Sequence, residues 1–173
     1  MMIAGLLLAL SALAALLQVL LPFHWIPADL PLLIAIFAGL RRGGGLGLLC
    51  GALAGLCLDA LGGQVPGLRM VPLALVGALA DSAERGVNRD QPRLQILAVA
   101  LLSLAHDGLL ILLAWHFNLN QGGLDRVLFS YVLPRALMQA LLAVPLFWAL
   151  SLLVRQRVFQ DPLRRPVRSI QRW

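Results

Sequence analysis

The sequence contains no lysine, and charged residues of any kind make up only 13% of it. Typical soluble domains carry about 25% charged residues, so this scarcity excludes most soluble folds. Apolar residues take their place, at 60% of the 173-residue chain. Runs such as 3–21 and 94–117 are long enough to cross a bilayer. The composition therefore predicts an all-α, polytopic bundle of transmembrane helices.

The residues that most catalytic and metal sites require are also scarce. The two cysteines, Cys50 and Cys57, lie in one apolar run, where helical rise would separate their Cα atoms by about 10 Å. That distance is too long for a disulfide, and no Gly-x-Ser-x-Gly elbow or His/Glu metal motif is present. We expect no cofactor, no metal and no enzyme. Acid/base hydrolysis by the intramembrane carboxylates Asp59 and Asp107 is the alternative.

The apolar segments predict six spans, and a five-span arrangement with one short segment re-entrant is the alternative. The 28–40 segment would cover only about 20 Å, against a hydrocarbon core of about 30 Å. The 68–80 segment can extend past Asp81 if Arg85 snorkels to the interface. The first segment lacks the basic start of a secretory signal, so we expect a retained span. The predicted spans are 3–21, 28–40, 43–61, 68–80, 94–117 and 127–154.

The arginines predict how the bundle is oriented. All 14 basic residues are arginine, against 8 acidic residues. With the N-terminus inside, most of them fall in cytoplasmic segments, so the positive-inside rule predicts that both termini are cytoplasmic. We divide the chain into a transmembrane domain, 1–154, and a basic cytoplasmic tail, 155–173. The tail should contact anionic lipids, or dock a cytoplasmic protein, and nucleic acid is not an expected partner.

The third predicted span has a regular glycine pattern. Gly43, Gly47, Gly51 and Gly55 recur at every fourth position and are followed at the same spacing by Asp59. A helix face without side chains lets another helix approach closely, which is how helices associate in lipid. This face therefore either packs within the bundle or receives the transmembrane helix of a partner.

Asp59 precedes a turn rich in glycine and proline, including Pro66 and Gly67 and ending at Arg69. We expect a tight turn at the outer end of the bundle. The carboxylate could pair with Arg69 or cap backbone amides in the turn. A functional contact with a partner is the alternative.

Ionisable residues inside spans are costly and need partners. Asp107 and Arg135 lie at similar predicted depths, roughly 12–15 Å below the outer surface by helical rise. We therefore expect a structural ion pair between neighbouring antiparallel helices. His106 is expected to be a packing histidine, although a ligand cavity lined by His106, Asp107 and Trp115 is the alternative. The ionisable residues within or beside the spans are Asp29, Asp59, Arg69, His106, Asp107 and Arg135.

The order and spacing of these residues resemble the family of the rod shape-determining protein MreD. The resemblance covers residues 26–117, together with chain length and the number of spans. It departs from the family in the absence of lysine and in Arg69 and Arg135. The matching strings are Pro27-Ala28-Asp29-Leu30, Arg41-Arg42, the glycines Gly47, Gly51 and Gly55 with Asp59, and Gly63-x-x-Pro66-Gly67-Leu68.

The resemblance implies a non-catalytic, multi-pass protein of the bacterial inner membrane. It implies direct binding of MreC, a single-pass protein with a periplasmic coiled coil. Together they would connect MreB filaments to the RodA glycosyltransferase and its transpeptidase, and so to peptidoglycan synthesis. The family is also similar in fold to substrate-binding subunits of energy-coupling-factor transporters. A small-molecule-binding subunit is therefore the alternative function.

Overall fold

The computed structural model describes residues 2–20, 29–62, 65–86, 92–117 and 132–158. Within these ranges the chain folds into six helices and no strand, which confirms the predicted all-α class. Four of them, α1, α3, α5 and α7, are long and apolar enough to cross a membrane. The helices are α1 (Met2–Leu20), α2 (Leu30–Arg42), α3 (Gly44–Gly62), α4 (Met70–Gly86), α5 (Pro92–His116) and α7 (Leu133–Val158).

The predicted spans agree with these helices except near the ends. Helix α4 continues to Gly86, so the segment does extend past Asp81. Helix α7 runs from Leu133 to Val158, whereas the sequence predicted 127–154, and residues 127–131 lie outside the described ranges. The first four residues of the predicted tail therefore continue α7, and residues 159–173 are not described.

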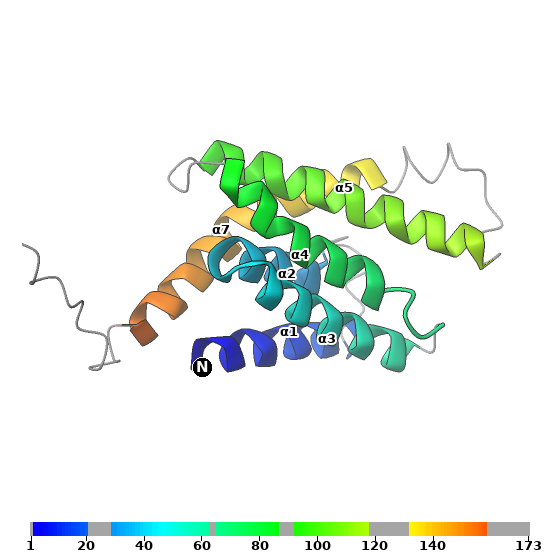
Figure 1. Ribbon diagram of the computed structural model, residues 1–173, viewed down its shortest axis with the longest axis horizontal. Coiled ribbons are helices and arrows are strands. Elements are labelled where there is room, and N and C mark those ends of the chain that lie inside the picture. Colours follow the sequence, from blue (N-terminus) through cyan, green and yellow to red (C-terminus); the bar gives the residue numbers. More distant parts are fainter. Residues whose placement is uncertain (1, 21–28, 63–64, 87–91, 118–131, 159–173) are drawn as a thin grey trace, which may run out of the picture.

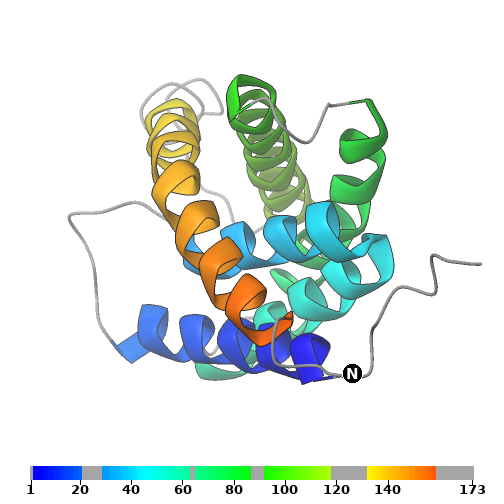
Figure 2. The same cartoon turned by 90° about the vertical axis from the view of Figure 1, so that its left-hand side faces the viewer.

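Helix α2 lies at the centre of the bundle (Figure 2). Its residues 31–40 are all buried, and an apolar surface on every face allows a helix to be surrounded by others in this way. Pro31 suits the first turn, where its missing N–H has no helical acceptor to lose. Protein rather than lipid covers this 13-residue helix, so its length need not match the hydrocarbon thickness.

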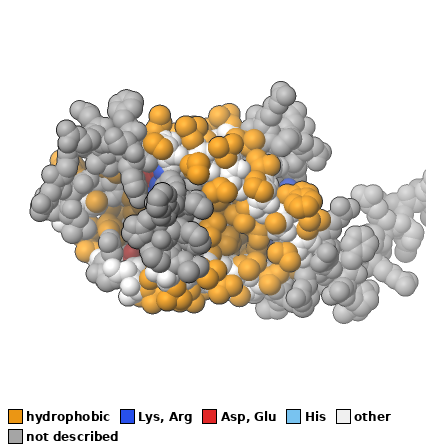
Figure 3. Space-filling model, turned by 180° about the vertical axis from the view of Figure 1, so that it is seen from behind, with side chains coloured by type: hydrophobic (Ala, Val, Ile, Leu, Met, Phe, Trp, Pro, Cys, Tyr) orange, Lys and Arg blue, Asp and Glu red, His pale blue; other side chains and the backbone are white. Residues whose placement is uncertain are grey.

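Successive helices run in opposite directions, so the start of α1 and the end of α7 lie at the same end of the bundle (Figure 1). Helices α2 and α3 are joined through Gly43 alone, whose φ of 98° favours glycine. The exterior carries many exposed leucines, and hydrophobic side chains make up most of the described surface that is visible in the middle of Figure 3. Such a surface suits lipid rather than water.

Candidate functional site

The glycine face of α3 packs against α4. A Cβ atom added at Gly51 would overlap the backbone carbonyl of Leu73, and one added at Gly55 would overlap the Cα atom of Met70. Of the two roles left open for this face, the structure shows the internal one. Because α4 covers it, we do not assign the helix of a partner to this surface.

Two further glycines, which the sequence reasoning missed, complete this contact. A Cβ at Gly47 would overlap the carbonyl oxygen of Gly77 in α4, and one at Gly77 would overlap the carbonyl oxygen of Gly47. A Cβ at Gly39 in α2 would meet the same Gly77 carbonyl. Three helices therefore approach one another through backbone atoms at this level. Gly39 and Gly77 are each an isolated glycine within an apolar run, and this was the only sequence signal for either of them.

Asp59 organises the turn between α3 and α4. Its carboxylate accepts hydrogen bonds from the backbone N–H groups of Gly67 (2.9 Å), Arg69 (3.0 Å) and Met70 (3.2 Å). The first N–H groups of a helix lack partners within the helix, and a carboxylate is favoured near the positive end of the helix dipole. Gly67 has a φ of 96°, which brings its N–H into this arrangement. The carboxylate thus caps α4.

A second polar centre joins three helices. The Arg135 guanidinium of α7 donates from Nη2 to Oδ2 of Asp29 at 2.8 Å, and its Nη1 lies 3.7 Å from Oδ1 of Asp107 in α5. His106 Nδ1 lies 3.2 Å from the same Asp107 oxygen. Asp29, His106 and Asp107 are each at least 95% buried. We call these four residues the charged cluster.

Asp29 is the member whose partnership the sequence did not predict. It occupies the N-cap position of α2, yet its side chain makes no capping hydrogen bond and turns to Arg135 instead. Helix α7 begins at Leu133, so Arg135 lies in its first turn. The sequence placed Arg135 eight residues inside a span that begins at residue 127, and residues 127–131 lie outside the described ranges. In the structure Arg135 reaches Asp29 at the start of α2.

The side chains of the alternative ligand cavity, His106, Asp107 and Trp115, do not share one environment. His106 and Asp107 are buried, but the Trp115 side chain is 69% exposed. A pocket between α2, α5 and α7 has none of the three in its lining. Nor do the described residues contain a cluster of three side chains suited to hold a metal ion.

Asp59 and Asp107, the two carboxylates that a hydrolase would need, have separate partners. Asp59 is occupied by backbone amides, and Asp107 by His106 and Arg135. The two carboxylates therefore have no common partner among the described residues.

The family model described as rod shape-determining protein MreD matches residues 1–157. No curated protein and no solved structure matches the chain significantly.

Proposed function

Because the chain belongs to the family of the rod shape-determining protein MreD, we propose that it is a non-catalytic inner-membrane scaffold of the cell-elongation complex. In this role it binds MreC directly and helps couple MreB filaments to peptidoglycan synthesis by RodA and its transpeptidase. The observation that carries the proposal is the family match, which covers nearly the whole described bundle. The family determines rod shape and is not a known family of enzymes.

The chemistry of the polar groups supports a scaffold. The side chains that could act in catalysis contact other parts of the bundle: Asp59 caps α4, and Arg135 joins Asp29 to Asp107. Such contacts fix the arrangement of helices. A rigid bundle with an apolar exterior is what a protein needs in order to present one face to the transmembrane helix of a partner.

The exposed part of the Asp59 turn and the outer faces of the helices are the surfaces that we propose for MreC. Pro66 is exposed in that turn, while the Asp59 carboxylate behind it is used internally. Along the bundle, α1 exposes Leu13 and α7 exposes Leu141. Helix association in lipid depends on close packing, so a tryptophan at a contact position should block binding.

The test is co-expression with the MreC encoded in the same genome, followed by affinity purification in detergent and measurement of the mass of the eluted complex. We expect stable co-elution. Leu13→Trp changes the outer face of α1, and Leu141→Trp changes the outer face of α7. Provided that both variants keep wild-type thermal stability, each serves as the control for the other. A folded chain that elutes alone would overturn the scaffold proposal.

We further propose that both ends of the bundle face the cytoplasm and that the arginine tail contacts anionic lipid. The start of α1 and the end of α7 lie at one end of the bundle (Figure 1), and the arginine distribution, through the positive-inside rule, supports a cytoplasmic position for that end. Labelling of single cysteines introduced at Gly45 and at Pro66 tests the orientation. A membrane-impermeant maleimide added to intact spheroplasts should label only the second, and the opposite result would reverse the topology.

A further inference from the structure

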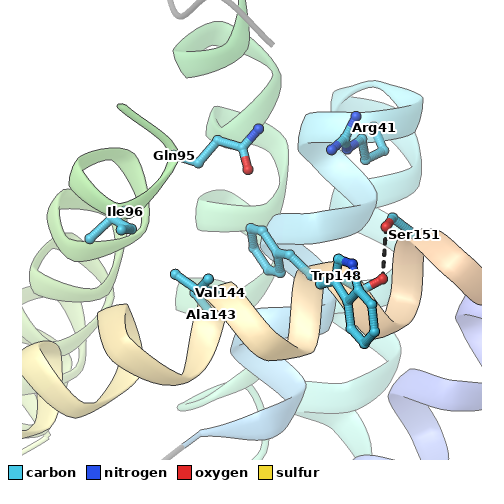
Figure 4. A pocket seen from close by; sticks show the side chains of 8 residues that line it. Arg41, Gln95, Ile96, Ala143, Val144, Trp148 and Ser151 are labelled. Carbon is cyan, nitrogen blue, oxygen red and sulfur yellow. Dashed lines mark hydrogen bonds between the residues drawn. The ribbon is translucent and has the colours of Figure 1, made fainter. Parts of the chain in front are cut away.

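A pocket of about 220 Å³ lies between α2, α5 and α7 (Figure 4). It occurs at the end of the bundle where α2 ends and α5 begins, away from the charged cluster. Its lining comes from Arg41 of α2, from Gln95 and Ile96 of α5, and from Ala143, Val144, Phe147, Trp148 and Ser151 of α7.

The course of α7 keeps this pocket open. Pro145 lies inside the helix, where it removes one backbone N–H donor and crowds the carbonyl four residues earlier, which bends helices. The half of α7 that follows Pro145 lies apart from α5 (Figures 1 and 2). Phe147 forms the inner wall, held by a tilted ring contact with Phe37 at 5.3 Å between centroids.

The pocket is polar at one end and apolar at the other. Arg41 and Ser151 line the end that coincides with the end of α2, and Ala143 and Val144 lie about two turns earlier along α7 (Figure 4). At helical rise, Ala143 and Val144 lie about 10–12 Å from Ser151 along the helix axis. Trp148, which is 68% exposed, lies at the rim, as tryptophan commonly does at the level of lipid head groups.

The guanidinium of Arg41 has no counter-ion among the residues that the structure describes. Among the described residues, no side chain forms an ion pair or hydrogen bond with it. Arginine binds phosphate oxygens through two parallel N–H groups, and basic pockets between transmembrane helices on the cytoplasmic side bind anionic head groups.

We propose that this pocket binds one anionic phospholipid, with its phosphate at Arg41 and the upper part of an acyl chain along Ala143, Val144 and Phe147. The positive charge at the polar end of the pocket matches the head group of such a lipid, and the apolar end matches its acyl chain. The rim at Trp148 and Val144 is exposed on the lipid-facing surface, so the lipid can enter from the bilayer.

Charge argues against two other occupants. The segment 159–173 of this chain holds Arg164, Arg165, Arg168 and Arg172, and it would bring more positive charge to Arg41. A second copy of the chain would present the same arginine end in a parallel arrangement. An anionic lipid instead supplies the missing negative charge.

The test is native mass spectrometry of the delipidated protein in a neutral detergent, with either dioleoylphosphatidylglycerol or dioleoylphosphatidylcholine added. The two lipids share their acyl chains and differ in net charge. We expect the anionic lipid to be retained about five-fold more strongly, because one arginine beside a head group corresponds to about that factor. Arg41→Gln should abolish the preference.

Arg42→Gln is the matched control, since Arg42 is the neighbouring exposed arginine and does not line the pocket. It should leave the preference unchanged. Val144→Trp fills the pocket from its exposed rim and should reduce retention of both lipids. All three variants are compared at unchanged melting temperature, and Val144→Trp tests the pocket independently of any effect of Arg41 on folding.

Four results would overturn the proposal. These are equal losses in Arg41→Gln and Arg42→Gln, equal retention of the two lipids, unchanged retention in Val144→Trp, and competition by glycerol phosphate, which would indicate a site for a free phosphate. A dimer mass that disappears in Val144→Trp would assign the pocket to a second copy. The experiment uses the chain alone, so its outcome is independent of MreC binding.

Discussion

The pair α3 and α4 and the pair α5 and α7 are held in different ways. Helices α3 and α4 make the most extensive contact in the bundle, with glycines of α3 against the backbone of α4. Helices α5 and α7 contact each other less extensively, and α7 touches α2 only slightly. The charged cluster joins α2, α5 and α7 at one end, and the pocket separates them at the other.

This difference follows from the solvent. In lipid, burial of apolar surface from water supplies no drive for helices to associate, so they depend on close van der Waals packing or on polar contacts. The α3–α4 pair depends on close packing, in which the backbones of the two helices approach each other through glycines. The α5–α7 pair depends on polar contacts, which hold the two helices together at one end. The other end of the pair is able to hold a ligand.

The largest expected effect is on the glycine contact. Gly51→Leu forces side-chain atoms into the backbone of α4 at Leu73, and we expect a loss of about 4 kcal/mol or more in free energy of unfolding. Gly45→Leu is the matched control, because a Cβ there has no neighbour within 4 Å. Titration with sodium dodecyl sulfate measures both, and equal stabilities would disprove the tight α3–α4 contact.

The charged cluster should give the next largest effect. Arg135→Gln leaves two buried carboxylates without their cation, so we expect a loss of about 3 kcal/mol, at the lower limit for a broken buried pair because the Arg135 side chain is 14% exposed. Asp29→Asn and Asp107→Asn should each be less than additive with it. Simple additivity in the double variants would show that the cluster contributes no coupling.

Substitution of Asp59 should have a smaller effect on stability. It should also distinguish capping of backbone amides from an ion pair with Arg69. Asp59→Ala removes the acceptor of three backbone N–H groups, and we expect a loss of about 2 kcal/mol. Asp59→Asn keeps one acceptor oxygen and should lose about half of that. Arg69→Gln leaves the backbone N–H in place and should match the wild type in thermal stability. If it were as destabilising as Asp59→Ala, an ion pair would be the main interaction.

The sequence predicted two kinds of feature: residues that recur at a regular helical spacing, and charged residues that need a partner within the membrane. The spacing of Gly47, Gly51 and Gly55 identified a packing face, because only a helix puts every fourth residue on one side. It did not identify α4 as the neighbour, since Gly77 carries no periodic signal. Asp107 and Arg135 were matched by predicted depth, but the contact between Arg135 and Asp29 was missed, because the sequence does not show that the start of α2 lies beside α7.

The smallest effect tests the side of the pocket that faces the bundle. Phe147→Leu removes the ring contact with Phe37 and leaves a small cavity beside α2, so we expect a loss of about 1 kcal/mol. Trp148→Leu is the control, since the adjacent indole is 68% exposed and contacts little of the bundle. Thermal unfolding in detergent compares them. If both variants had the thermal stability of the wild type, the half of α7 after Pro145 would contribute little to holding the helix in the bundle. The charged cluster would then be the principal attachment of α7.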